Sequence, residues 1–239
     1  MQRTMTSGYS KRLCAYCQLA SSTRQGDHIF AREFFLEAQR ANLPKAPCCA
    51  TCNGAKARHE HYLTAVLPFG GRHDDAVASI EATETRLGEN LRLKRELEDG
   101  LELGASPDGS SLVPFQDEHL RGLFEMIPKG LLWYHAGVYL PENYGALAFA
   151  APSGAVEPNP NFGPGAETYR GNLGNGVFEY EGVTNPSDRF SSAWVFKLFG
   201  GAKFLTDAHE FGEDADRMVA LTGPADMFDE LRAQVDRRT

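Results

Sequence analysis

The chain has 239 residues, of which 42% are hydrophobic and 23% charged, and a formal net charge of -8. This composition excludes a disordered chain, a collagen-like repeat and a coiled-coil rod. Taken alone, the negative charge argues against a nucleic-acid partner, because polyanions bind basic surfaces. The charge is unevenly distributed, however: residues 1–65 carry 9 Lys and Arg against 4 Asp and Glu (+5), and residues 66–239 carry 15 against 28 (-13). We therefore expect the two regions to have different roles.

All five cysteines lie in one span of 39 residues near the N-terminus: Cys14, Cys17, Cys48, Cys49 and Cys52. The first residues lack the apolar core of a signal peptide, and no apolar stretch approaches the roughly 20 residues that a bilayer span needs. We therefore expect a cytoplasmic protein with no membrane segment. In a reducing compartment, clustered cysteines are metal ligands or redox thiols more often than disulfides.

Two Cys-x2-Cys pairs delimit this block, Cys14-Ala-Tyr-Cys17 and Cys49-Ala-Thr-Cys52. Each pair puts two thiolates on one tight turn, where both sulfurs reach a single ion at about 2.3 Å. The sequence therefore predicts a structural Zn2+ held by Cys14, Cys17, Cys49 and Cys52. Cys48 is an alternative to Cys49, although Cys48-x3-Cys52 is the less usual spacing. The 31 residues between the pairs exceed the spacing of a zinc ribbon, which predicts a structural unit between them.

Three short motifs lie in and just after that intervening segment: Gly26-Asp27-His28-Ile29-Phe30, Asn42-Leu43-Pro44 and Cys52-Asn53-Gly54-Ala55-Lys56. In this order, within two Cys-x2-Cys pairs, the motifs resemble the HNH endonucleases of the zinc-knuckle type. In that family an Asp-His ends the first strand of a hairpin, an Asn-Leu opens the second strand, and a Cys-His or Cys-Asn followed by Lys starts a helix. The resemblance covers about residues 11–62, a quarter of the chain.

The resemblance implies an α+β fold in which the N-terminal part is a treble-clef-like ββα-metal nuclease core bound to zinc. It implies that His28 is the general base that takes a proton from the attacking water, and that Asn42 orients the His28 ring. Asp27 and Asn53 would then hold a catalytic divalent cation, which neutralises charge at the scissile phosphate. Lys56, Arg58 and His59 follow on the same helix and would contact the nucleic acid, which we expect to be DNA.

The chain departs from the family pattern at two places. Asn53 stands where many relatives have His, and its amide oxygen suits Mg2+ or Mn2+ better than Zn2+. His59 and His61 are alternative ligands, but neither lies four residues after Asn53, where Ala57 stands. The Gly-rich loop of many relatives is replaced by Phe30 to Gln39, whose aromatic spacing predicts a short helix packed in the core.

Beyond this block the pattern predicts a charged amphipathic helix from Asp74 to about Leu103, which we interpret as a connector. Residues 105–116 and 152–176 are predicted loops, because they are rich in Gly, Pro and Ser. Strands are predicted at Leu131 to Tyr139, Ala146 to Ala151, Gly176 to Tyr180 and Ser191 to Phe199, and helices at Asp117 to Met126 and Pro224 to Val235.

These patterns predict three regions: a zinc-stabilised nuclease domain at residues 1–70, a helical connector at 71–104, and an α+β region of unknown role at 105–239. The leading functional hypothesis is a metal-dependent endonuclease that hydrolyses phosphodiester bonds in DNA. The alternative is a zinc-stabilised nucleic-acid-binding protein without catalysis. A redox switch built on the cysteine pairs is a third hypothesis, and it requires an accessible thiol of low pKa.

Overall fold

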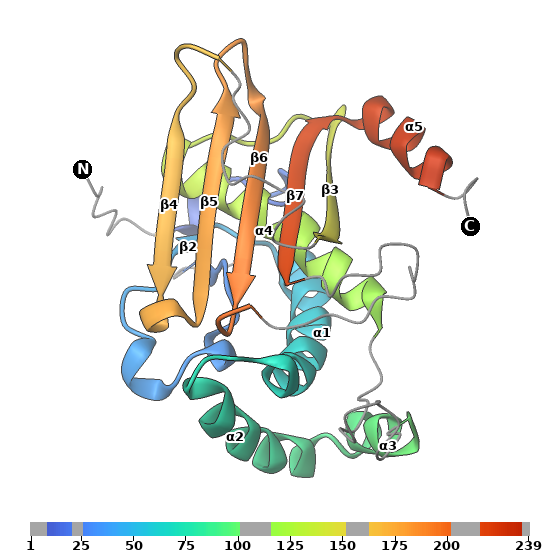
Figure 1. The fold of residues 1–239 in the computed structure, drawn as a ribbon. Helices are drawn as coiled ribbons and strands as arrows, with labels where there is room; N and C mark the ends of the chain where they lie inside the picture. Colours follow the sequence, from blue (N-terminus) through green and yellow to red (C-terminus); the bar gives the residue numbers. More distant parts are fainter. Residues whose placement is uncertain (1–8, 21–25, 101–115, 152–162, 202–215, 236–239) are drawn as a thin grey trace.

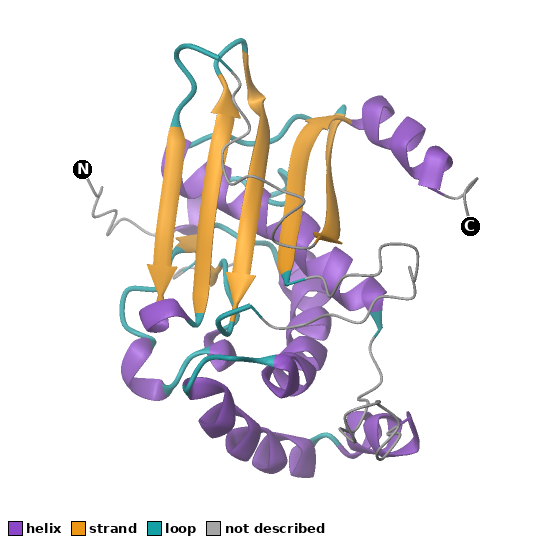
Figure 2. Ribbon diagram, viewed as in Figure 1, coloured by secondary structure: helices purple, strands orange, loops and turns teal. Residues whose placement is uncertain are grey.

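The computed structural model describes residues 9–20, 26–100, 116–151, 163–201 and 216–235 of the chain. In these ranges the fold is mixed α+β, as expected, with two antiparallel sheets and five α-helices (Figures 1 and 2). No helix in the described ranges is long and apolar enough to cross a membrane.

A five-stranded antiparallel sheet forms the centre of the C-terminal half. Its strands lie in the order β3-β7-β6-β5-β4. Side chains alternate between the two faces of each strand, and one face carries large buried rings that contact helix α4, including Phe178 and Phe196 around Phe124. The strands are β3 (Tyr144–Ala151), β4 (Thr168–Leu173), β5 (Phe178–Asn185), β6 (Asp188–Leu198) and β7 (Arg217–Pro224).

Helices cover one face of this sheet and extend below it (Figure 1). Helix α4 crosses the face, and helix α1 packs on α4. The N-terminal block contributes a short hairpin ahead of α1, and 3-10 turns occur at Tyr9–Lys11 (η1), Arg32–Phe34 (η2), Glu37–Gln39 (η3), Leu67–Gly70 (η4) and Gly174–Gly176 (η5). The remaining elements are β1 (Asp27–His28), β2 (Lys45–Ala46), α1 (Ala50–Val66), α2 (Asp75–Glu89), α3 (Leu91–Gly100), α4 (Asp117–Ala136) and α5 (Ala225–Val235).

Helix α4 corrects two of the predicted elements. The helix expected to end at Met126 continues to Ala136, so the strand predicted from Leu131 is wrong. The helix passes through Pro128 and ends at Gly137, whose positive φ of 69° closes its last turn. A short apolar run has the same composition in a buried strand and in a buried helix, and periodicity alone does not separate the two.

Other elements also differ from the prediction. The single helix expected from Asp74 is two helices, because Asn90 ends α2 and its Oδ1 accepts a hydrogen bond from Leu93 N at 3.2 Å, which caps α3. The helix predicted over Phe30 to Gln39 is two separate 3-10 turns, η2 and η3.

Strand β4 lies inside the predicted loop 152–176, and β7 was not predicted. The predicted α5 is confirmed. Residues 101–115 and 152–162 lie outside the described ranges.

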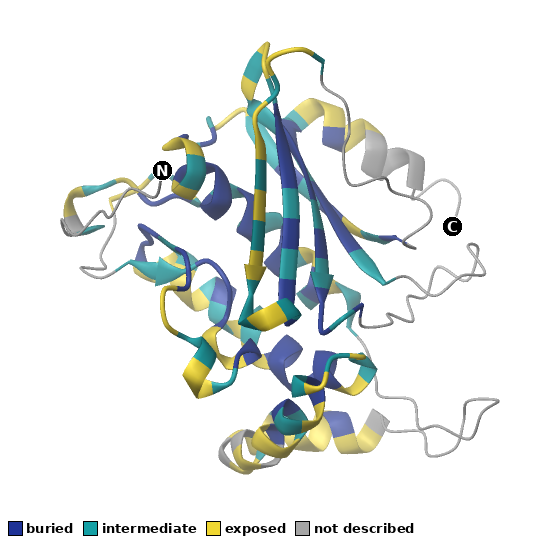
Figure 3. Ribbon diagram, turned by 60° about the vertical axis from the view of Figure 1, so that its left-hand side comes forward, coloured by how far each residue is buried: buried dark blue, intermediate teal, exposed yellow. Residues whose placement is uncertain are grey.

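One cluster of buried residues joins the N-terminal block to the sheet (Figure 3). The ring of Phe30 lies 4.4 Å from that of Phe178, centroid to centroid, and the ring of Phe34 lies 6.1 Å from it. The boundary predicted after residue 70 is therefore crossed by packed side chains. The division into three regions stays a prediction.

Candidate functional site

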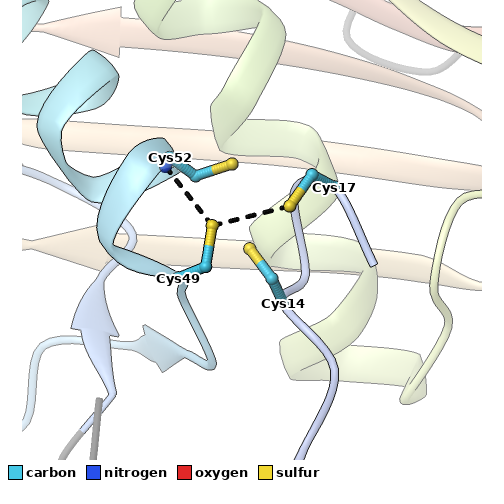
Figure 4. A group of neighbouring side chains, drawn as sticks. All are labelled: Cys14, Cys17, Cys49 and Cys52. Atoms are coloured by element: carbon cyan, nitrogen blue, oxygen red, sulfur yellow. Dashed lines mark hydrogen bonds between the residues drawn. The ribbon is translucent and has the colours of Figure 1, made fainter. Parts of the chain in front are cut away.

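The four cysteines of the two Cys-x2-Cys pairs converge on one point (Figure 4). Their Sγ atoms all lie within 4.8 Å of one another, and Cys17 Sγ is 3.5 Å from Cys49 Sγ. Sulfurs bound tetrahedrally at 2.3 Å are about 3.8 Å apart, so the four can hold a structural metal such as zinc. The predicted set Cys14, Cys17, Cys49 and Cys52 is thus brought together. It is the one group of three or more His, Cys, Asp or Glu with metal-binding spacing in the described part of the chain.

Local backbone structure shapes both cysteine pairs. In the first pair, Cys14 N donates to Leu19 O at 2.6 Å, and Leu13 and Ala20 form a β-bridge that closes the turn. In the second, Cys49 is the N-cap of α1 and its Sγ accepts a hydrogen bond from Cys52 N at 3.4 Å. The second pair therefore sits on the first turn of a helix, where the helix dipole favours thiolates.

The fifth cysteine lies beside the cluster and not in it. Cys48 is fully buried, and its Sγ donates to Cys49 O at 3.3 Å. A hydrogen bond with Cys48 lowers the pKa of Cys14 to about 4, whereas burial raises the pKa of the Cys17 and Cys52 thiols above the ordinary value. A bound cation favours the thiolate form of every one of its ligands.

A lysine from helix α4 adds a positive charge near the sulfurs. Burial lowers the pKa of Lys129, and the neighbouring Glu125 carboxylate and the thiols of Cys52, Cys17 and Cys14 act in the opposite direction. Four thiolates around Zn2+ carry a net charge of -2, so a nearby ammonium offsets part of it.

The candidate base His28 lies on a short hairpin between the two cysteine pairs. His28 pairs with Lys45, and Asp27 pairs with Ala46, in the antiparallel register of β1 and β2. Burial, followed by the nearby charges of Lys45 and Arg32, lowers the pKa of His28 to about 4. At neutral pH the imidazole is therefore uncharged, the form that accepts a proton, and its surroundings are basic.

Lys56 has a different environment from the one expected. It is 1% exposed, and its Nζ lies 2.6 Å from His28 O, 2.9 Å from Asp27 Oδ2 and 2.5 Å from Glu60 Oε1. A side chain enclosed in this way has no surface left to offer a phosphate, so the prediction that Lys56 contacts nucleic acid is corrected. Lys56 instead joins α1 to β1 through an internal ion-pair cluster.

The two asparagines of the predicted site occupy exposed positions. Asn42 lies in a turn with a φ of 63°, a conformation that Asn adopts more readily than most residues. Within the described residues no hydrogen bond joins its side chain to His28, so the structure does not bring these two predicted partners together. Asn53 is exposed on the first turn of α1, three residues before Lys56 and hence on the same face of the helix.

The remaining predicted contact residues also lie on α1. Arg58 is exposed, as a phosphate contact requires. His59 instead turns toward α4, where its Nδ1 lies 3.2 Å from His119 Nδ1. A Cβ on Gly122 would come within 2.5 Å of the His59 ring, which shows how closely the two helices approach. His59 is therefore a half-buried residue of the helix interface, and its contact with nucleic acid stays a prediction.

Two residues near Asp27 were not predicted. Burial raises the pKa of Glu60 to about 7, against the opposing effect of Lys56. Tyr16 Oη is buried and has no hydrogen-bond partner among the described residues, and burial, then Asp27, raise its pKa. The i,i+4 spacing of Lys56 and Glu60 is a signal that sequence can supply. No local pattern identifies Tyr16, because it approaches Asp27 only through the fold.

Comparison of the chain with protein-family models, with curated proteins and with solved structures finds no match to any of them.

Proposed function

We propose that the protein is a metal-dependent endonuclease that hydrolyses phosphodiester bonds in DNA, with His28 as the general base. The observation that carries the proposal is the environment of His28. It is a half-buried imidazole on a hairpin between two cysteine pairs, with Lys45 and Arg32 close enough to act on its charge. A neutral imidazole takes the proton of an attacking water, and basic neighbours attract a phosphate.

The order of elements supports the same proposal. The hairpin β1-β2 precedes α1, and the four cysteines join the first turn of α1 to the segment ahead of the hairpin. A structural zinc at these cysteines would fix the first turn of α1 to the segment ahead of β1 without taking part in catalysis. The order of hairpin, helix and cysteine pairs is the one that the resemblance to zinc-knuckle HNH endonucleases implies.

The catalytic cation belongs to the proposal as well. Asp27 and Asn53 supply carboxylate and amide oxygens, the donors that Mg2+ and Mn2+ prefer. The Oδ2 atom of Asp27 pairs with Lys56 at 2.9 Å, so the other carboxylate oxygen, Oδ1, is the one proposed as the ligand. A bound divalent cation would supply charge neutralisation at the phosphate.

The test is plasmid cleavage by the zinc-loaded full chain with Mg2+ or Mn2+. We expect nicking or linearisation, and we expect His28→Ala to abolish it while the zinc content is unchanged. The matched control is His73→Ala, because His73 lies on the turn before α2, where its Nδ1 accepts from Asp75 N, and has no role in the proposed site. Equal cleavage by the wild-type chain and by His28→Ala would refute His28 as the base.

The second candidate is a zinc-stabilised nucleic-acid-binding protein without catalysis, and the ion pair between Asp27 and Lys56 favours it. A carboxylate already held by an ammonium binds an added cation less readily. This candidate predicts DNA binding with no cleavage in Mg2+, Mn2+, Ca2+ or Zn2+. Gel-shift and cleavage measurements on the same samples separate the two candidates.

A further inference from the structure

The ammonium of Lys56 is shared between two carboxylates, one on β1 and one on α1. Its Nζ lies 2.9 Å from Asp27 Oδ2 and 2.5 Å from Glu60 Oε1, and it donates to His28 O at 2.6 Å. An ammonium has three protons to donate, so these oxygens use its full capacity. Asp27 therefore holds only part of this cation.

The pairing of Lys56 with Glu60 is part of the helix itself. The two residues are four positions apart on α1, so their side chains leave the helix on the same face. Asp27 reaches the ammonium from a separate element, the short strand β1. Any carboxylate on β1 thus meets an ammonium that already has a carboxylate partner.

The charges of this cluster leave an excess of negative charge. Lys56 contributes +1, and the ionised carboxylates of Asp27 and Glu60 contribute -1 each. Lys56 is 1% exposed, and charges in such a position are screened little by salt. The Asp27 side chain is 16% exposed, so a cation from solvent can approach it. That cation would meet a group with a net charge of -1 rather than a neutral ion pair.

Other charged groups act on the same cluster. Burial raises the pKa of Glu60 to about 7, against the effect of Lys56, so Glu60 is mostly ionised at pH 8. Glu33 adds a negative charge nearby, whereas Lys45 and Arg32 add positive charges beside the hairpin. Because positive charges repel a metal ion, the negative charge of Glu60 matters for binding one here.

We propose that Glu60 is a positioning residue for the divalent cation: by sharing the Lys56 ammonium, it leaves Asp27 the negative charge needed to bind Mg2+ or Mn2+. Glu60 acts through Lys56 and is not itself a ligand. Without the charge of Glu60, the same ammonium would neutralise Asp27 in full. The inference rests on the proposed function, because Asp27 is the ligand assigned there.

The test is Mn2+ binding to the zinc-loaded full chain at pH 8, measured from the EPR signal of free Mn2+. Mn2+ prefers oxygen ligands to thiolates, so it leaves the zinc site occupied. We expect Asp27→Asn to remove the Mn2+ site. Glu60→Gln keeps the size of the side chain and should weaken Mn2+ binding about tenfold, because one nearby negative charge is lost.

The matched control is Glu98→Gln. Glu98 also pairs with a lysine four residues earlier on a helix, Lys94, but both side chains are exposed. Its charge is screened by solvent, so Glu98→Gln should leave the affinity for Mn2+ unchanged.

A double variant separates this role of Glu60 from a purely structural one. In Lys56→Met/Glu60→Gln no ammonium competes for Asp27, so the affinity for Mn2+ should rise above that of Glu60→Gln. A purely structural role predicts that the double variant binds Mn2+ as weakly as Glu60→Gln or more weakly. Circular dichroism and zinc content identify the folded samples. If the double variant does not fold, the comparison of Glu60→Gln with Glu98→Gln decides.

Each result decides the proposal. It is overturned if the wild-type chain binds no Mn2+, if Asp27→Asn still binds it, or if Glu60→Gln binds it as tightly as the wild-type chain. Cleavage of DNA by the wild-type chain, with unchanged Mn2+ affinity in Glu60→Gln, would keep the nuclease and reject this role of Glu60. Mn2+ affinities in the expected order without DNA cleavage would keep the role of Glu60 and reject the nuclease.

Discussion

Lys56 of α1 places its ammonium 2.9 Å from the Asp27 carboxylate of β1, in a position where Lys56 is 1% exposed. The same ammonium also contacts Glu60 and the main-chain carbonyl of His28. One buried cation thus fixes the strand that carries the candidate base to the helix that carries two of the zinc-site cysteines. The position of His28 depends on this contact as well as on strand pairing.

Lys56→Met should therefore destabilise the protein strongly. It removes the cation and leaves Asp27 and Glu60 uncompensated, which costs about 3–5 kcal/mol for a buried pair. The double variant Lys56→Met/Glu60→Gln should recover part of the loss, because one buried charge is neutralised. The measurement is urea unfolding of zinc-loaded protein, and a loss of less than 1 kcal/mol would contradict a structural role for the cluster.

The control for Lys56 is Lys94→Met. Lys94 also pairs with a glutamate four residues later, Glu98, but both side chains are about half exposed. Exposed pairs of this kind contribute roughly 0.3–0.5 kcal/mol. The difference between the two variants measures the effect of burial on one type of ion pair.

Gly122→Ala should destabilise the contact between α1 and α4. The added Cβ would lie 2.5 Å from the His59 ring, and overpacking of this kind costs about 1–3 kcal/mol. Gly88→Ala is the matched control, since a Cβ at Gly88 of α2 meets nothing within 4 Å and Ala favours helix by about 1 kcal/mol. Thermal unfolding should show opposite signs for the two variants, and His59→Ala should relieve the cost of Gly122→Ala.

Cys52→Ser should remove the structural metal. A ligand set of four thiolates binds about one Zn2+ per chain, and loss of one ligand weakens binding and the folding coupled to it. Cys48→Ser is the control, because Cys48 lies outside the group of four. Metal analysis after gel filtration should show zinc in Cys48→Ser and little or none in Cys52→Ser. Loss of zinc from both variants would contradict this set of four and make Cys48 a ligand.

His135 should make stability depend on pH. Burial lowers its pKa to about 4, and its Nε2 lies 3.0 Å from Tyr180 Oη. The unfolded chain, with a His pKa near 6.5, binds more protons between these values. The contribution of neutral His135 to the free energy of unfolding is therefore complete above pH 6.5. About 1–3 kcal/mol of it is lost as the pH falls toward 4.

The measurement for His135 compares the wild-type chain with His135→Gln at pH 7 and pH 5 by urea unfolding. Acid also removes zinc from thiolates, but that loss occurs in both proteins and cancels in the difference. We expect the difference in free energy of unfolding between the two proteins to be smaller at pH 5 than at pH 7. A difference that is constant with pH would show that His135 does not titrate in this range.

The cysteine cluster was predictable because the spacing of residues within each pair is a local feature of the sequence. Two residues separate the cysteines within each pair, and that spacing alone puts two sulfurs on one turn. The convergence of Cys14 and Cys17 with Cys49 and Cys52 is confirmed. The Cys-x2-Cys spacing also favoured Cys49 over Cys48. In the structure Cys49 is the N-cap of α1, and its Sγ accepts a hydrogen bond from Cys52 N.

The surroundings of Lys56 and His59 were not predicted, because they come from distant segments of the chain. A helix position is exposed or buried according to what packs on it, and the partners are β1 for Lys56 and α4 for His59. The resemblance to the HNH family offered a role for each residue but not its neighbours. The pairing of Lys56 with Glu60 was the one contact that sequence spacing could have indicated.

The predicted elements failed where composition is ambiguous. The run Leu131 to Trp133 is apolar, as buried helices and buried strands both are, and α4 also contains Pro128, a residue type that usually ends a helix. Strand β4 exposes Thr168, Arg170 and Asn172 at the edge of the sheet, so its polar sequence resembled a loop.

The contact between the tilted rings of Phe30 and Phe178 has a consequence for recombination of the gene. A gene segment that encodes only residues 1–70 would supply both cysteine pairs but not the sheet or α4, so Phe30, Phe34 and Leu63 would lose their cover and meet water. Recombination at that point would transfer a fragment whose core side chains are exposed to water. The cysteine block and the sheet are therefore expected to be inherited together, as one unit.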